Sequence, residues 1–286
     1  MMWLRYFFLL CFLLYFPVIK AQTVTDDISH TVILSHPPKR IISLAPDLTE
    51  LLFAAGAGQY IVGVMKGSDY PSAAKKIPVI ANYNALNIEA ILALHPDLIV
   101  AWKQNSYASQ LRLLQRFNIP VYFSDQHDLS DIPNTLQRLG VLSGTEKIAN
   151  HAAEKFHIRY VELQKKYAHH KPISVFYQLW SHPLMTVNKT SWINQIITLC
   201  GGKNIFADVK NPTPQINLEA VIVANPDIIL SSDSSPGWKI RWQQWSQMTA
   251  VRQKHLFTVE PDLLERAGPR LLEGADRVCQ FLQAAR

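Results

Sequence analysis

The sequence of 286 residues lacks the short motifs that identify nucleotide-binding proteins and common hydrolases. It contains no GxGxxG, and the stretch Gly201-Gly202-Lys203-Asn204 lacks the upstream glycine and the Ser/Thr of a phosphate-binding loop. GxSxG and HExxH are also absent, which excludes the usual serine nucleophile and metalloprotease zinc site. The ten histidines are dispersed, and no pair has a metal-ligand spacing with a matching carboxylate, so we predict no metal site.

Long hydrophobic runs are missing beyond the first 21 residues, so we expect the mature chain to be soluble. Residues 1–21 have the pattern of a secretory signal peptide: Arg5, an apolar run from Phe7 to Phe16, and a small residue at Ala21. The alternative is an uncleaved N-terminal anchor. A lipoprotein is rejected because Leu10, which is not a small residue, precedes Cys11.

Strong charge of one sign is missing too. Removal of residues 1–21 takes away Arg5 and Lys20 and lowers the formal net charge from +6 to +4. The remaining basic residues are scattered and form no stripe, which argues against nucleic acid as a partner. The 265 residues left are enough for two cores of ordinary domain size.

Cysteine is scarce, and Cys200 and Cys279 alone would survive processing. In an oxidising compartment an even pair favours one disulfide. Two buried free thiols are the alternative, and the separation does not fit a zinc site.

Against these absences stands an internal repeat. Asn87–Val100 (NIEAILALHPDLIV) and Asn217–Leu230 (NLEAVIVANPDIIL) are offset by 130 residues, and residues 40–43 and 172–175 give a second echo. Each copy predicts an asparagine N-cap, a short apolar helix, a Pro-Asp turn and a buried parallel strand. The repeat places Glu89 and Glu219 at equivalent positions of two similar units.

The chain therefore predicts an α/β protein of two pseudo-equivalent lobes with mostly parallel sheets and a ligand cleft between them. The expected parts are an N-terminal lobe over 22–143, a rigid bridging helix over 144–171 and a C-terminal lobe over 172–286. That helix favours small opening motions. Asp47 and Glu50 predict a capping box before a helix that ends at Gly56. Further strands are predicted at 40–44, 61–65, 120–124, 173–179, 185–187 and 256–259, and further helices at 106–118, 132–139, 192–199 and from about 269.

Several aromatic residues follow the ends of predicted strands or lie in loops, where α/β sheets bind ligands. Tyr83 and Trp102 are predicted more strongly as cleft walls than as core residues, whereas both roles stay open for Trp180 and Trp238. Arg266 is the best candidate for a charged group in the cleft; a surface ion pair with Glu265 or Asp262 is the alternative. Aromatic walls with few polar anchors favour binding a large, flat, partly apolar ligand rather than catalysis.

Five segments then carry a resemblance: Ile42–Gly56 (ISLAPDLTELLFAAG), SDYP, PDLIVAW, LCGGKNIF and LERAGPR. With these segments the chain resembles the periplasmic cobalamin (vitamin B12) binding proteins of bacterial ATP-driven importers, over nearly the whole mature length. PDL and GG-NIF are shared with the wider class that captures siderophores and haem. ERAGPR and the two cysteines fit the cobalamin members better.

The resemblance implies a periplasmic protein, not an enzyme, that holds one corrinoid between its lobes and delivers it to the permease and ATPase of an ABC importer. It implies that Tyr83 and Trp102 line the corrin, that Asp47 lies at the rim and that Arg266 contacts the ligand. It also implies a Cys200–Cys279 disulfide. Glu89 and Glu219 would pair with permease arginines; otherwise they are ordinary exposed helix carboxylates.

The chain departs from the family at Gly67, Leu179 and Thr213, where members often have an aromatic residue. These three, with Trp180 as a substitute aromatic and Asp262 beside Arg266, complete the predicted ligand-binding set. Cobalamin is expected as cargo, with no resident cofactor, and the free protein is expected to be a monomer. A sibling binder of haem or ferric siderophore remains an alternative, although haem would want an axial ligand that we cannot place. A corrinoid- or metal-processing cleft enzyme is another, with His182 and Asp69 as its candidate groups.

Overall fold

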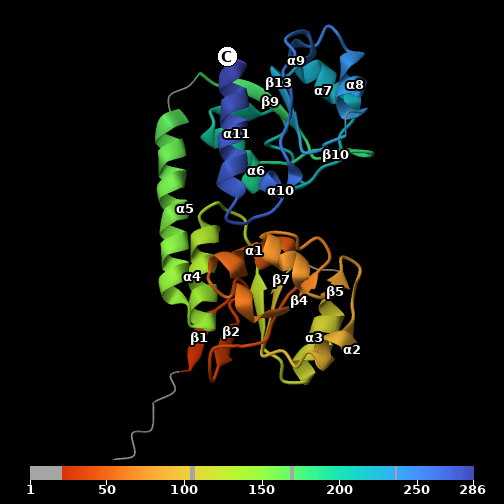
Figure 1. Cartoon of the computed structure of the whole chain (residues 1–286). Helices are drawn as coiled ribbons and strands as arrows, with labels where there is room; N and C mark the ends of the chain where they lie inside the picture. Colours follow the sequence, from red (N-terminus) through yellow and green to blue (C-terminus); the bar gives the residue numbers. More distant parts are fainter. Residues whose placement is uncertain (1–20, 104–106, 168–170, 236) are drawn as a thin grey trace, which may run out of the picture.

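The computed structural model describes residues 21–103, 107–167, 171–235 and 237–286. The predicted signal peptide, apart from Ala21, lies outside the described residues. The chain forms two α/β lobes, and the long helix α5 (Glu146–Tyr167) runs beside both of them (Figure 1). None of the helices in the described ranges is long and apolar enough to cross a membrane.

The N-terminal lobe is built on a six-stranded sheet of order β6-β5-β4-β3-β7-β8. All neighbours are parallel except β5 and β6, which run antiparallel. The central strands are apolar and buried because helices cover both faces of a parallel sheet. The strands are β3 (Ile41–Ser43), β4 (Ile61–Met65), β5 (Val79–Asn82), β6 (Ala85–Leu86), β7 (Leu98–Trp102) and β8 (Val121–Ser124). The helices are α1 (Pro46–Ala54), α2 (Ile88–Ala93), α3 (Ala108–Arg116) and α4 (Asp131–Ser143), with 3₁₀ turns η1 (Gly58–Tyr60) and η2 (Ser72–Lys76).

The C-terminal lobe has a four-stranded, fully parallel sheet of order β12-β9-β13-β14. Its strands are β9 (Ile173–Gln178), β12 (Gly202–Asn204), β13 (Ile228–Ser231) and β14 (Leu256–Thr258). Its helices are α6 (Trp192–Leu199), α7 (Leu218–Ala224), α8 (Gly237–Gln243), α9 (Thr249–Arg252), α10 (Pro261–Leu264) and α11 (Leu271–Ala284). The predicted fold class is confirmed.

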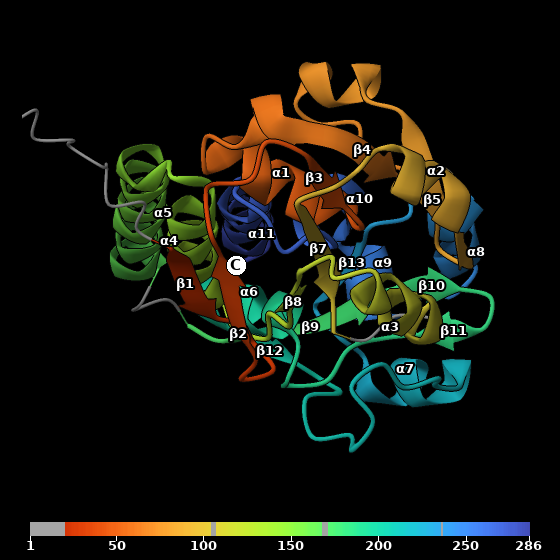
Figure 2. The same cartoon turned by 90° about the horizontal axis from the view of Figure 1, so that it is seen from below.

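Two antiparallel hairpins lie outside the main sheets. The first, β1 (Gln22–Thr25) with β2 (Thr31–Leu34), lies beside α4, and Figure 2 shows it next to the α4–α5 pair. The second, β10 (Trp180–Ser181) with β11 (Leu184–Met185), extends outward from the C-terminal lobe (Figure 1). The predicted strand over 185–187 is thus wrong in its extent, since the hairpin turn starts it one residue earlier and ends it at Met185.

The internal repeat produces the same structure twice. Asn87 caps α2 and Asn217 caps α7, each side chain accepting a hydrogen bond from the backbone N–H three residues later. The aspartate of each Pro-Asp turn then fastens the neighbouring strand: Asp97 accepts from the Arg40 N–H at 3.0 Å, and Asp227 from the Ser174 N–H at 2.9 Å. The repeat therefore encodes a helix, a turn and the docking of the strand that precedes it.

The capping box predicted for Asp47 and Glu50 is wrong. Helix α1 begins at Pro46, with Ala45 in the cap position. Proline is well suited to the first position of a helix because its φ is already helical, so the helix starts earlier than predicted. Asp47 is consequently inside the first turn. The predicted end at Gly56 is confirmed by its positive φ of 87°.

One continuous apolar core crosses the boundary between the lobes. It joins residues of α1 and α4 to residues of α6 and α11 through Phe156, Leu163 and Tyr167 on α5. Arg159 of α5 also pairs with Asp276 of α11, with 2.9 Å between Nη2 and Oδ2. A Cys200–Cys279 disulfide ties the end of α6 to α11, as predicted. The bridging helix is therefore packed against both lobes.

Candidate functional site

The carboxyl ends of the parallel strands of both lobes lie at the boundary between the lobes, the place where α/β sheets bind ligands. In the N-terminal lobe, β3, β4 and β7 lead into Asp47, Gly67 and Trp102. In the C-terminal lobe, β9 leads into Leu179 and the Trp180 hairpin. The loop after α10 carries Arg266 across to the N-terminal lobe.

Asp47 and Trp102 are in direct contact. The Trp102 indole Nε1–H donates to Asp47 Oδ2 over 2.9 Å. Asp47 is buried, whereas Trp102 is only partly buried. Burial raises the pKa of the Asp47 carboxyl to about 7, although the bond from Trp102 works in the opposite direction. Asp47 thus lies behind the aromatic wall rather than at an open rim.

Gly67 lies close to the Tyr83 hydroxyl. A Cβ built on Gly67 would lie 3.4 Å from the Tyr83 hydroxyl oxygen and 3.5 Å from Pro46 Cγ. The backbone φ of Gly67 is +93°, a conformation that side chains other than glycine rarely adopt. Tyr83 is 57% exposed, so its ring is available to a ligand. The Tyr83 hydroxyl therefore lies next to the space that a side chain at position 67 would occupy.

Arg266 connects the two lobes through an ionic cluster. Its Nη1 lies 3.0 Å from Glu50 Oε1 and 2.8 Å from Asp69 Oδ1, both in the N-terminal lobe. Its Nη2 lies 2.8 Å from Asp262 Oδ1 and 3.2 Å from the Gly67 carbonyl oxygen. The ion pair with Asp262 that was the alternative for Arg266 is thus present, together with contacts to the other lobe, and its role toward a ligand stays a prediction.

Glu50 and Arg270 belong to this cluster, although neither was predicted as a site residue. Arg270 makes two hydrogen bonds to Glu50, of 2.9 Å and 2.7 Å, and its guanidinium stacks on the Tyr70 ring 3.8 Å from the centroid. The Glu50 side chain is only 1% exposed. A carboxylate inside the apolar run of α1 was the available signal, since such a group needs a cationic partner.

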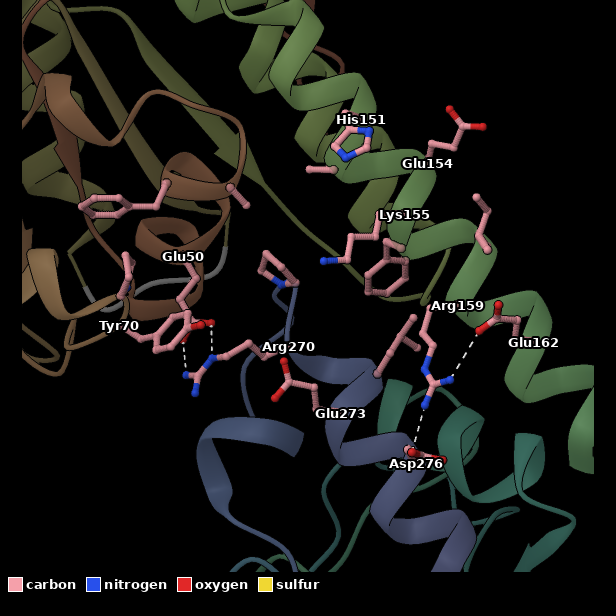
Figure 3. A pocket seen from close by; sticks show the side chains of 18 of the residues that line it. Glu50, Tyr70, His151, Glu154, Lys155, Arg159, Glu162, Arg270, Glu273 and Asp276 are labelled. Carbon is pink, nitrogen blue, oxygen red and sulfur yellow. Dashed lines mark hydrogen bonds and ion pairs between the residues drawn. The ribbon is translucent and has the colours of Figure 1, made fainter.

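A cavity of about 1360 Å³ lies on the α5 side of this cluster. Figure 3 shows Glu50, Tyr70 and Arg270 at one end of it, with Arg159 and Glu162 of α5 at the other. Its lining carries charges of both signs and includes none of the predicted ligand-binding residues. The Glu50–Arg270 pair therefore belongs both to the ionic cluster and to the lining of this cavity.

The remaining candidates lie in the C-terminal lobe. Leu179 is half-buried, Trp180 is 61% exposed on β10, and Thr213 lies in an exposed loop before α7. Trp238, by contrast, is a core residue: it is 2% exposed and packs in a cluster that includes Phe176 and Trp242. His182 lies in the hairpin turn and contacts Arg241.

Glu89 and Glu219 occupy matching positions, each the second residue of its helix and each exposed. Among the residues that the structure describes, no group of three or more His, Cys, Asp or Glu side chains is arranged to hold a metal ion. The arrangement offers aromatic surface, carboxylates and one shared arginine.

Comparison with known proteins identifies relatives with the same architecture. Residues 41–263 match the sequence profile described as periplasmic binding protein. The vitamin B12-binding protein of Pectobacterium atrosepticum is 39% identical over 253 residues, covering 86% of this chain and 88% of that protein. The crystal structure of the periplasmic vitamin B12 binding protein BtuF of Vibrio cholerae superposes with a TM-score of 0.81 at 36% identity, covering 87% of this chain and 98% of that one. The periplasmic haem-binding protein RhuT from Roseiflexus sp. RS-1 superposes with a TM-score of 0.77 at 23% identity, over 87% and 99% of the two chains, which shows a common fold.

Proposed function

Because this chain belongs to the periplasmic binding protein family, we propose that it captures cobalamin or a close corrinoid between its lobes and delivers it to an ABC importer. Relatives that are 36% and 39% identical over 250 and 253 aligned residues are named vitamin B12-binding proteins. The protein acts in the periplasm after removal of residues 1–21, and it binds its cargo without turnover.

The formal charge of the Arg266 cluster favours a neutral ligand with amide N–H donors over an anionic ligand. Three carboxylates, of Glu50, Asp69 and Asp262, surround the guanidinium groups of Arg266 and Arg270, which leaves the cluster with a net charge of −1. Asp69 and Asp262 remain about half exposed. Exposed carboxylates accept hydrogen bonds from neutral amide N–H groups, which the corrin ring carries around its edge.

The same cluster disfavours the anionic ligands of sibling proteins. Haem carries propionate carboxylates, and ferric catecholates carry net negative charge. Both need a cation that is not already shared, whereas Arg266 is shared among three carboxylates. The aromatic wall of Tyr83, Trp102 and Trp180 then supplies the flat apolar surface for the corrin.

The cluster also argues against a cleft enzyme. Although partial burial acts in the other direction, the hydrogen bond from Arg266 lowers the pKa of the Asp69 carboxyl, which makes it a poor general base. His182 contacts Arg241 on its own lobe.

The direct test is a calorimetric titration of residues 22–286 with cyanocobalamin, with haem and a ferric catecholate siderophore in parallel. We expect one-to-one binding of cobalamin alone. Heat with haem or siderophore and none with cobalamin would overturn the ligand while leaving the family unchanged.

We assign the docking of the permease to Glu89 and Glu219, which present equivalent carboxylates from the two lobes. The double variant Glu89→Ala/Glu219→Ala should keep its cobalamin affinity and lose at least tenfold in affinity for the reconstituted transporter, since two exposed charge pairs are removed. Binding to the transporter in nanodiscs measures this. Glu146→Ala/Glu154→Ala, which removes two exposed glutamates of α5, is the matched control. Equal docking by both double variants would contradict the assignment.

A further inference from the structure

Asp47 fixes the position of the Trp102 indole through a hydrogen bond from its buried side. It is the second residue of α1, and its Oδ2 accepts the Trp102 indole N–H over 2.9 Å. Trp102 is the last residue of β7 and is partly exposed. The other oxygen, Oδ1, is buried and makes no hydrogen bond within the described ranges, although the first-turn backbone N–H groups of Asp47 and Leu48 lie near the carboxyl.

Among the residues with described positions, none forms an ion pair with Asp47. On α1 itself the nearest charge is Glu50, which repels a second negative charge. Arg266 and Arg270, from the other lobe, direct their guanidinium groups to Glu50. Tyr107 lies before α3, and its hydroxyl donates to the Leu44 carbonyl oxygen. Burial raises the pKa of this hydroxyl, and the charges of Asp47 and Tyr83 raise it further. The loop after α10 contributes backbone at Gly268.

This environment makes the carboxyl sensitive to protons in the neutral range. Burial raises its pKa to about 7, so it changes charge between pH 6 and 8. A hydrogen bond to an ionised acceptor is stronger than one to a neutral acceptor. The indole of Trp102 is therefore held firmly at higher pH and more loosely at lower pH.

We infer that Asp47 is a positioning residue for ligand capture, which fixes the Trp102 indole as a wall of the cleft and couples that hold to the proton concentration of the medium. The effect on Trp102 is a property of the empty protein. The effect on capture rests on the proposed function, and the two are measured separately.

The alternative is a purely local role, in which the acidic side chain only favours the positive end of α1. That role would leave the Trp102 indole unaffected by the protonation of Asp47. The indole is therefore the group to observe.

The first experiment follows the Trp102 Nε1–H resonance by ¹H–¹⁵N NMR of residues 22–286 without ligand, with Trp102→Phe used for assignment. We expect the resonance to titrate with a midpoint near pH 7 in the wild type and to stay constant in Asp47→Asn, whose side-chain oxygen still accepts the bond. Asp208→Asn, which removes an exposed carboxylate, should titrate like the wild type. A wild-type resonance that does not move, or that moves equally in Asp47→Asn, overturns the inference.

The second experiment measures cyanocobalamin affinity by calorimetry at pH 5.5 and 8.5. The wild type should bind about five- to tenfold more weakly at pH 5.5, the difference between a charged and a neutral hydrogen bond. Asp47→Asn and Trp102→Phe should bind equally at both pH values. A pH effect of the same size in all three proteins overturns the role in capture. Absence of cobalamin binding at either pH overturns the proposed function and the role in capture with it, while the indole titration still decides the coupling.

Discussion

Asp47 and Glu50 lie one turn apart on α1, yet their surroundings are opposite. Glu50 receives hydrogen bonds from two arginines of the other lobe, whereas Asp47 receives one from an uncharged indole. A buried carboxylate without a cation remains costly to ionise, and burial raises the pKa of Asp47 accordingly. Neighbouring acids on one helix thus have different tasks, because one joins the lobes and the other supports an aromatic wall.

The raised pKa of Asp47 predicts a stability change that depends on pH. The folded protein keeps this proton up to about pH 7, whereas the unfolded chain loses it near the ordinary value of about 4, so stability falls as the pH rises from 4 to 7. Asp47→Asn removes this loss. Relative to the wild type, Asp47→Asn should therefore raise the free energy of unfolding, and this gain should be up to about 3 kcal/mol larger at pH 8 than at pH 5.

Urea denaturation of the wild type and Asp47→Asn at the two pH values measures this difference. Asp208→Asn, at an exposed position, should change little at either pH. A gain of equal size at pH 5 and pH 8 would contradict the assigned cause.

Among the elements, the repeated unit shows what can be read from sequence. The asparagine caps of α2 and α7 were predictable because capping is a local interaction between a side chain and the next turn. The strand order and the docking of Asp97 and Asp227 were not, because their partners lie more than 50 residues away in the chain. Local chemistry was legible, and long-range pairing was not.

The same limit explains the errors at the candidate site. Asp47 was assigned to a cap because its spacing to Glu50 fits a capping box, but both side chains are engaged by distant residues. Both roles stayed open for Trp238, and the fold decides for the core, because α8 packs it into the cluster that includes Phe176. The interlobe contacts of Arg270 were missed, since nothing close in the chain indicates them. The ligand-binding and docking assignments remain predictions.

The two turn aspartates predict matched losses of stability. Asp97→Ala removes two hydrogen bonds from the backbone N–H groups of Lys39 and Arg40, and Asp227→Ala removes those from the N–H and hydroxyl of Ser174. Each variant should lose about 2–3 kcal/mol in the free energy of unfolding. The two losses should add in the double variant, because the sites are in separate lobes. Urea denaturation tests this, and a single loss below about 0.5 kcal/mol would contradict the fastening role.

At the scale of the whole molecule, the lobes are joined by α5, by the core that crosses between them and by two polar contacts. The first is the Arg266 cluster, which includes Glu50. The second is Gln195 of α6, which bonds to the Leu129 N–H over 3.1 Å and to the His127 carbonyl over 3.2 Å. These connections favour small changes of the angle between the lobes rather than wide hinge opening.

We expect the Arg266 cluster to help maintain the angle between the lobes, and Glu50 is the residue that tests this. Glu50→Ala leaves Arg266 and Arg270, both mostly buried, without their shared carboxylate and should lower the free energy of unfolding by about 3 kcal/mol. It should also increase the radius of gyration in solution scattering, because the lobes lose contacts on the cleft side. Glu273→Ala, an exposed change on α11, should have neither effect. An unchanged scattering curve for Glu50→Ala would show that the core alone sets the angle.

The apolar core that passes through α5 determines what a backbone cut between the lobes would expose. Each lobe keeps an apolar cluster of its own on one side of its sheet, whereas Phe156, Leu163 and Tyr167 of α5 belong to a third cluster drawn from both lobes. A polypeptide cut between Ser143 and Glu146 would yield one fragment without the apolar face that covers α4 and another with that face exposed to water. A single cut in the backbone at this point would therefore leave both fragments prone to association through their exposed apolar surface.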